Sequence, residues 1–297
     1  MDFVSNFFLL YGIIEVYKCS RVIKMDVKFV VNDYVLIWNL LFQASISESI
    51  YQLKQKLWVN YKDEYNNTYR DKNAILKDPK NFIPNDDTIY NIVLETKDYI
   101  SLKREAEKYR MTLMKLWDSN KKKIERLVKR VLKINLKHYT FLVVNEELNV
   151  IDISAHDQED GYIIVGEKID KKDPQKTIIK IILELVKHEV RNKETNNIEI
   201  RKALIDLAVL NEFATDIYGR SCYISGDPSR NQLIRHLYPY WLMYLGVPKD
   251  EFETFMSRDK IPFNKDQYAY EKELKKMSLG DMIDFCIRNS KYIIRTE

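Results

Sequence analysis

Glycine and proline are scarce in this chain, with seven of each among 297 residues. The turns of β-barrels and β-sandwiches use both residues heavily, whereas long helices tolerate few of either. The scarcity therefore argues against a turn-rich all-β fold and predicts that helices dominate. Hydrophobic residues make up 45% of the chain, which is enough apolar material for a core. The length favours one large domain or two modest ones.

Cysteine and net charge are also low. The three cysteines, Cys19, Cys222 and Cys286, lie far apart and form no C-x-x-C pair, so no zinc finger or disulfide framework can be inferred from them. Reduced thiols in a cytoplasmic protein are the simplest explanation. The 48 basic and 44 acidic residues leave a net charge of only +4, which does not favour nucleic acid as a partner.

No hydrophobic run is long enough to span a bilayer. Residues 7–14 (FFLLYGII) are apolar but too short, and they lack the basic start and small-residue cleavage site of a signal peptide. We interpret residues 1–24 as a peripheral N-terminal segment, or as an extension that precedes a natural start at Met25. No stable membrane insertion is expected.

The segment from residue 25 to 137 is predicted to form a helical domain. Val27–Val31 is typical of a short strand, and Asp33 is suited to cap a helix that ends at Phe42. The spacing of Ser45 and Glu48 matches a capping box at the start of a helix that runs to about Tyr69. Residues 88–136 are expected to be helical almost throughout, with a break near residues 118–120.

A basic stretch, Lys121 to Lys137, occupies the end of this helical region. It has two interpretations: a surface for an anionic partner, or a solvated helix face with extended lysine side chains. We favour the solvated face, because no aromatic residues lie between the charges to stack on bases.

The pattern changes to strands at residue 138, where we place a domain boundary. The expected strands are Thr140–Val144, Leu148–Ile153 and Tyr162–Val165, with residues 145–147 as a hairpin turn. Helices are expected at residues 177–193 and 198–219 and again from Asp227 onward, with Gly219 ending the second and Ser278 and Asp281 forming a capping box. The predicted fold is α+β and mostly helical, with a small antiparallel sheet in residues 138–297.

The first helix after these strands carries a histidine, a glutamate and an asparagine at zinc-site spacing. His188 and Asn192 lie on the same helix face, one turn apart, and Glu189 follows the histidine directly. Side chains at such positions converge on one metal ion, and the glutamate reaches the metal-bound water as a general base.

The next helix carries Asn211 and Glu212, and the glutamate lies 24 positions after His188. In this spacing, and in residues 210–219 (LNEFATDIYG), the sequence resembles the thermolysin-like gluzincin metallopeptidases. The resemblance covers residues 139–219. It implies that His188 and Glu212 bind zinc, that Glu189 acts as the base, and that Asp216 hydrogen-bonds a ligand histidine.

The chain departs from that family at Asn192, where the pattern has a second histidine. An amide oxygen is a weak zinc ligand, and catalytic zinc needs three good ones. Downstream, the family uses a histidine or tyrosine to stabilise the oxyanion, and His236, Tyr238 and Tyr240 all remain candidates.

Two hypotheses follow. The chain is a degenerate metallopeptidase-like protein that is catalytically impaired and acts in binding or regulation, or else an atypical zinc-dependent peptide hydrolase. The alternative is a non-enzymatic helical protein with no metal site, in which Glu189, Glu212 and Asp216 pair with the neighbouring Lys187, Arg191 and Arg220. Both hypotheses expect a protein or peptide partner, and neither indicates an oligomeric state.

Overall fold

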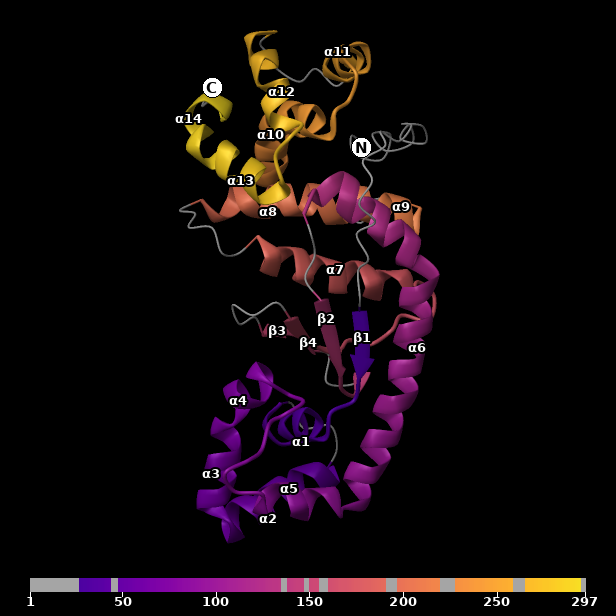
Figure 1. Ribbon diagram of the computed structural model, residues 1–297, viewed down its shortest axis with the longest axis vertical. Helices are drawn as coiled ribbons and strands as arrows, with labels where there is room; N and C mark the ends of the chain where they lie inside the picture. The colour runs from indigo at the N-terminus through magenta and orange to yellow at the C-terminus, as the bar shows by residue number, and fades with distance from the viewer. Residues whose placement is uncertain are drawn as a thin grey trace. The chain divides into compact units, whose positions relative to one another are not determined.

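The computed structural model describes residues 27–43, 48–134, 138–146, 150–154, 160–190, 197–219, 228–258 and 265–294 (Figure 1). The N-terminal segment 1–24, Ser45 of the predicted capping box and Asn192 lie outside the described residues. Helices account for most of the residues that are described, as the glycine and proline content predicted.

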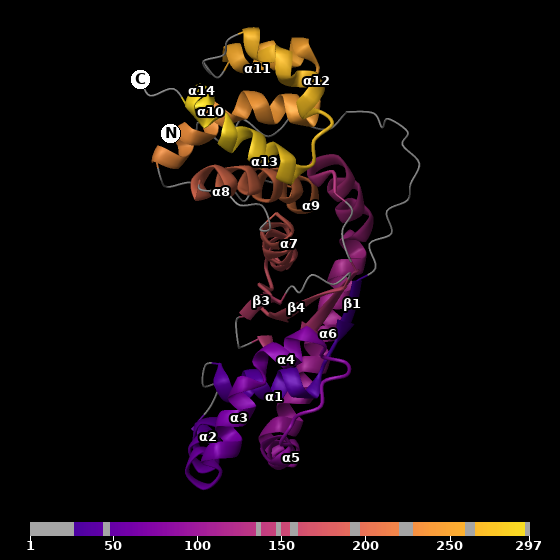
Figure 2. The same cartoon turned by 60° about the vertical axis from the view of Figure 1, so that its left-hand side comes forward.

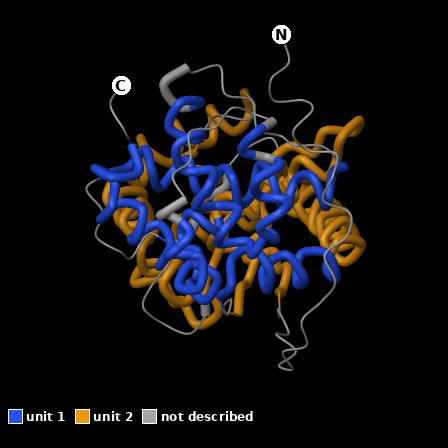
Figure 3. The backbone as a smooth tube through the Cα atoms, turned by 90° about the horizontal axis from the view of Figure 1, so that it is seen from above, with its two compact units in different colours: residues 1–24, 121–136, 185–297 blue, residues 25–120, 137–184 orange. Residues whose placement is uncertain are grey.

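The described residues pack as two compact units (Figure 3). We call residues 25–120 and 137–184 the N-terminal unit, and residues 121–136 and 185–297 the C-terminal unit. This division differs from the boundary that we placed at residue 138, because the strands pack with the first helices rather than with the last ones.

The N-terminal unit combines a four-stranded sheet with short helices and the greater part of one long helix. Its elements are β1 (Val27–Val30), α1 (Asp33–Phe42), α2 (Glu48–Asn60), α3 (Lys62–Arg70), α4 (Lys72–Lys77), α5 (Thr88–Leu94), α6 (Lys97–Leu127), β2 (His138–Val143), β3 (Val150–Ser154), β4 (Asp160–Gly166) and α7 (Gln175–Glu189). The ends of α6 and α7 continue into the C-terminal unit. The predicted break near residues 118–120 is wrong, since α6 runs through them.

The sheet is not the antiparallel one that we predicted. Its strand order is β1-β2-β4-β3; β1 and β4 both pair in parallel with β2, and only β3 is antiparallel, to β4. The predicted hairpin between the first two of the expected strands is therefore wrong, because β4 lies between β2 and β3. Residues 141–144 and 162–165 are buried without alternation, which is typical of central parallel strands covered on both faces.

Helices cover both faces of the sheet. Leu142, Val144, Tyr162 and Ile164 join a buried core with residues of α1, α2, α4, α5 and the first part of α6 (Figure 2). On the opposite face, the indole of Trp117 on α6 lies across the rings of two strand phenylalanines, Phe29 and Phe141, with ring centroids 6.1 and 5.3 Å away. Burying aromatic rings on both faces supplies much of the stabilisation of such a sheet.

A glycine in β4 makes room for a tyrosine in β2. Gly161 lies opposite Tyr139 in the register of the two strands. A Cβ atom at Gly161 would lie 2.4 Å from Cε1 of the Tyr139 ring, and that side chain is 1% exposed. The space above Gly161 is therefore filled by the ring, and the position requires the absence of a side chain.

The start of α1 is capped by Asn32, one residue before the cap that we predicted. The Asn32 side chain accepts a hydrogen bond from the backbone N–H of Val35. Asp33 lies in the first turn, where it accepts a hydrogen bond from Tyr99 Oη at 2.6 Å and pairs with Lys103 at 2.8 Å. A carboxylate there also interacts favourably with the helix dipole.

The C-terminal unit is helical throughout its described residues. Its elements are η1 (Val128–Leu132), α8 (Ile198–Asp206), η3 (Leu207–Phe213), α9 (Ala214–Tyr218), α10 (Pro228–Leu245), α11 (Lys249–Arg258), η4 (Lys265–Tyr270), α12 (Glu271–Leu274), α13 (Leu279–Arg288) and α14 (Ser290–Ile293). The helix α8 packs against α10 and α13. Gly219, at φ +81°, ends α9, and the capping box of Ser278 and Asp281 is confirmed.

One lysine closes helix ends in this unit. Lys133 has the left-handed φ of 51° directly after η1. Its Nζ donates hydrogen bonds to the carbonyl oxygens of Tyr244 and Lys275, the latter at 3.0 Å, and lies 3.8 Å from the centre of the Tyr244 ring. Burial, and to a lesser degree Lys275, lowers the pKa of Lys133 to about 8.

Replacing Lys133 by methionine keeps the aliphatic stem but removes the donor. Two carbonyl oxygens at helix ends then lose a charge-assisted hydrogen bond, and we expect the unfolding free energy to fall by about 1–2 kcal/mol. Urea unfolding measures the loss, with Lys122→Met at an exposed position of α6 as the matched control. Equal stabilities of the two variants would contradict this structural role for Lys133.

Within the described ranges, no helix has both the length and the apolar composition to cross a membrane.

Candidate functional site

The sequence-predicted ligand Glu212 is buried where two π-helical segments meet. It belongs to η3, which contacts η1 within the C-terminal unit. Its side chain is 8% exposed, which is rare for a glutamate. π-Helical turns are uncommon and occur frequently at functional sites, because the extra residue turns side chains out of the regular helical positions.

A guanidinium and an amide face the Glu212 carboxylate. Arg130 Nη2, from η1, lies 3.5 Å from Glu212 Oε2, and Asn211 Nδ2 donates a hydrogen bond of 3.2 Å to Oε1. Burial raises the pKa of Glu212 to about 6, Asp216 adds to the rise, and Arg130, Trp241 and Asn211 counteract it. The pKa of the Glu212 carboxyl therefore lies just below neutral pH, and such shifted pKa values cluster at functional sites.

Asp216, one turn beyond Glu212, is bound by the same basic helix. Arg126 Nη2 lies 2.8 and 2.7 Å from the two Asp216 carboxylate oxygens, and Lys123 Nζ donates to the Asp216 carbonyl at 3.1 Å. In the metallopeptidase resemblance this aspartate orients a ligand histidine. Here its carboxylate is engaged by an arginine instead.

Two residues beside Glu212 carry a buried polar atom without a hydrogen bond of ordinary geometry to any described residue. These atoms are Asn211 Oδ1 and Trp241 Nε1. The Trp241 indole is near enough to lower the pKa of Glu212, although it makes no hydrogen bond of ordinary geometry. Such atoms are rare in folded proteins.

The remaining sequence-predicted residues belong to α7 or α10 or lie outside the described residues. Half-buried His188 and Glu189 end α7, half-buried His236 lies in α10, and Tyr238 and Tyr240 are buried in the same helix. Asn192 lies outside the described residues. Across the ranges that the structure describes, no three His, Cys, Asp or Glu side chains gather closely enough to hold a metal ion.

The described donors fit a zinc site poorly. Glu212, the best anionic ligand of the predicted set, already faces the positive charge of Arg130, and at position 192 the chain has an asparagine amide where the resemblance needs a histidine. Zinc prefers three nitrogen, sulfur or carboxylate ligands that are not shared with a competing cation.

Sequence reasoning missed the two arginines, although a signal was present. Arg126 and Arg130 lie four residues apart on one helix, and Glu212 and Asp216 lie four residues apart on another. Arg126 pairs with Asp216 and Arg130 with Glu212, so the order is reversed, as expected for antiparallel helices. The basic stretch is therefore more than the solvated face that we favoured, because part of it neutralises buried and half-buried carboxylates.

Comparison with protein-family models, with curated proteins and with solved structures finds no match for this chain.

Proposed function

We propose that the C-terminal unit is a metallopeptidase-like scaffold that does not hydrolyse peptides and that functions by binding a protein or peptide partner. The observation that carries the proposal is the position of Arg130, whose guanidinium lies 3.5 Å from the Glu212 carboxylate. In this proposal the arginine takes the place of the zinc ion as the cation beside Glu212.

Electrostatic repulsion opposes the binding of zinc beside Arg130. A zinc ion bound to Glu212 would lie about 2 Å from a carboxylate oxygen. It would then be within a few ångströms of Arg130, and two unit charges about 4 Å apart repel by about 4 kcal/mol at the effective dielectric of a protein surface. A divalent ion is repelled more strongly, so zinc affinity falls by at least a thousandfold unless the arginine moves away.

The arginine pairs also account for retention of the acidic residues without catalysis. They join the basic helix to the helix of Glu212 and Asp216 within the C-terminal unit. Exposed ion pairs contribute little to stability, but a buried carboxylate must keep its cation once the metal is lost. The scaffold can thus keep its shape, and with it a surface for a partner, after the chemistry has disappeared.

Metal analysis of the full chain, purified without a histidine tag and supplemented with zinc, tests the proposal. We expect less than about 0.1 zinc per chain, because Arg130 opposes occupation of the site. Zinc-dependent catalysis requires an occupied site, so this result would exclude it. Arg130→Met is the informative variant, since it removes the competing charge, and its zinc content is expected to equal or exceed that of the wild type.

One zinc per wild-type chain, lost in both His188→Ala and Glu212→Gln, would overturn the proposal in favour of an atypical hydrolase. Zinc that is lost in neither variant would come from another site and would leave Arg130 as the cation at Glu212. The matched control is Glu199→Gln, in an exposed position of α8 that pairs with Lys202.

A further inference from the structure

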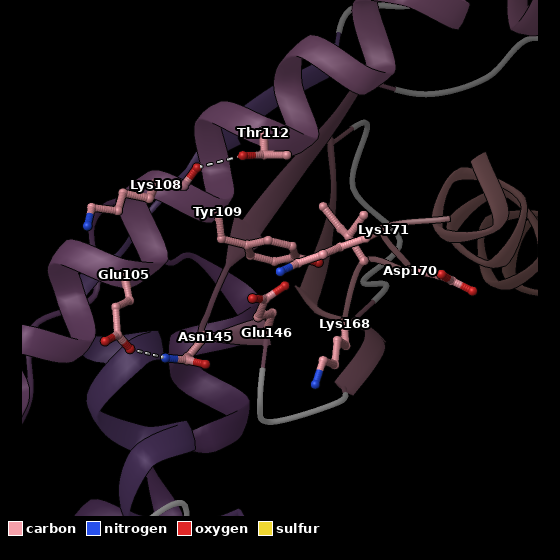
Figure 4. A pocket seen from close by; sticks show the side chains of 10 residues that line it. Glu105, Lys108, Tyr109, Thr112, Asn145, Glu146, Lys168, Asp170 and Lys171 are labelled. Carbon is pink, nitrogen blue, oxygen red and sulfur yellow. Dashed lines mark hydrogen bonds between the residues drawn. The ribbon is translucent and has the colours of Figure 1, made fainter. Parts of the chain in front are cut away.

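A pocket of about 990 Å³ lies within the N-terminal unit, and none of the candidate site residues that the sequence indicated is among the residues that line it (Figure 4). Its lining comes from three places: one side of α6, the residues after β2, and the residues after β4. The lining residues are Glu105, Lys108, Tyr109, Thr112, Asn145, Glu146 and residues 168–171.

The sheet topology explains why a pocket forms there. The strands β2 and β4 are parallel neighbours, so the chain leaves both strands at the same edge of the sheet. Ligands of α/β proteins bind outside the carboxyl ends of parallel strands, where loops from neighbouring strands meet. Asn145 and Glu146 follow β2, and Lys168 to Lys171 follow β4, so the pocket occupies that place.

Hydrogen bonds between elements fix the walls. Asn145, which is 3% exposed, donates from Nδ2 to Glu105 Oε2 at 3.0 Å and so ties the end of β2 to α6. Tyr109 Oη donates to the carbonyl of Glu167 and ties the end of β4 to the same helix. Burial raises the pKa of Tyr109, so the phenol stays protonated and remains a donor. The pocket is therefore preformed.

The charges of the lining are balanced. The lining includes three lysines, Lys108, Lys168 and Lys171, and three carboxylates, Glu105, Glu146 and Asp170. Glu105 accepts a hydrogen bond from Asn145, and Asp170 lies 3.8 Å from Lys176. In Figure 4 the side chains of Lys171 and Glu146 both reach toward the Tyr109 ring, so an ammonium and a carboxylate border the same space. A polyphosphate would meet as many negative groups as positive ones there, and a purely cationic ligand would meet the lysines.

We propose that this pocket binds a small zwitterion, of the size of an amino acid or short peptide, which carries an ammonium and a carboxylate. The ligand ammonium binds Glu146, and the ligand carboxylate binds Lys171. The volume lies within the range of small-molecule sites, about 300–1,000 Å³, and leaves room for a second or third residue of a peptide.

Thermal unfolding of the full chain with a panel of compounds tests the proposal. The probes are the common free amino acids, mixed di- and tripeptides, the same peptides with blocked ends, dicarboxylates, diamines, ATP and inorganic phosphate. At a concentration about a hundredfold above its Kd, a binding zwitterion is expected to raise Tm by roughly 5 °C. Blocking either end of the ligand is expected to abolish the shift.

Two variants locate the binding. Glu146→Gln and Lys171→Gln each remove one of the two charges, and each is expected to weaken the affinity at least tenfold by isothermal titration. Lys172→Gln is the matched control, since this exposed lysine is adjacent in sequence but does not line the pocket. Unchanged Tm values of the free variants would show that neither substitution disturbs the fold.

Failure of every unblocked zwitterion to raise Tm would overturn the proposal. Equal stabilisation by ATP, phosphate or a dicarboxylate would overturn it too, since the pocket would then select anions alone. An affinity that survives both Glu146→Gln and Lys171→Gln would place the binding elsewhere. None of these outcomes depends on the zinc content of the C-terminal unit.

Discussion

Arg130→Met is expected to lower the unfolding free energy of the C-terminal unit by about 2–3 kcal/mol at pH 7.5. Removing one partner of a fully buried ion pair costs about 3–5 kcal/mol, because the other charge remains without compensation. Arg130 is 41% exposed whereas Glu212 is 8% exposed, so the solvent recovers part of that cost. Methionine preserves much of the aliphatic stem, so the measured loss reports the charge.

The loss depends on pH with a definite sign. The folded-state pKa of Glu212, about 6, lies above the ordinary value of 4.5, so its contribution to stability is complete below pH 4.5 and is lost as pH rises through 6. Without Arg130 this pKa moves still higher, and the loss continues to a higher pH. The difference between variant and wild type should therefore be near zero at pH 4.5 and grow between pH 6 and 7.5.

Urea unfolding at pH 4.5 and 7.5 measures this difference, and hydrogen exchange in α8 and α10 assigns it to the C-terminal unit. Glu212→Gln supplies the second arm of a double-mutant cycle. In that background Arg130→Met is expected to cost less than about 0.5 kcal/mol, since no buried negative charge remains. A cost that is equal at the two pH values, or equal in both backgrounds, would refute the electrostatic role of Arg130.

Gly161→Val is expected to destabilise the N-terminal unit by about 3 kcal/mol or more. The new Cβ atom would lie 2.4 Å from the Tyr139 ring, well inside van der Waals contact. Because Tyr139 is 1% exposed, its ring has no free space to enter, and overpacking of this kind costs about 1–3 kcal/mol even for small additions. The two further methyl groups of valine add to the overlap.

The control removes the ring rather than the glycine. In a Tyr139→Ala background the space opposite Gly161 is empty, and Gly161→Ala should then cost less than about 1 kcal/mol. In the wild-type background the same alanine should cost about 1–3 kcal/mol. Thermal and urea unfolding measure both. If Gly161→Ala were equally costly in the two backgrounds, backbone conformation rather than the ring would determine the requirement for glycine.

Local features of the fold could be predicted from the sequence, and long-range ones could not. Helix content, the strand at Val27, the end of α9 at Gly219 and the Ser278 capping box all depend on neighbouring residues, and the structure confirms them. Strand order depends on pairing between distant segments, such as β1 with β2. Parallel pairing was still indicated by the unbroken apolar runs, which we interpreted as hairpin strands.

The candidate site shows the same limit. Glu212 and Asp216 could be singled out from their own helix, but their partners lie more than eighty positions earlier in the chain. No local pattern connects two segments so far apart. Only the matching four-residue spacing of the arginines and the carboxylates carried that information, and it becomes meaningful once antiparallel helices are considered.

The pocket at the ends of β2 and β4 could not have been predicted at all. It exists because β2 and β4 are parallel neighbours, whereas the predicted hairpin would have paired β2 with the strand that follows it in sequence. The lining charges are common surface residues with no motif. Correct topology was therefore the prerequisite for finding this site.

The interleaving of the two units along the chain limits how the protein can be divided and how it is made. Residues 121–136 belong with residues beyond 185, although they interrupt the N-terminal unit. A fragment that starts at residue 185 would lack Arg126, Arg130 and Lys133. A fragment that ends at residue 184 would expose the apolar side chains of Ile124, Leu127 and Val131, which are buried in the whole chain. During synthesis on the ribosome, residues 121–136 emerge long before the residues that cover them. Their apolar side chains therefore stay exposed until the last third of the chain has been translated.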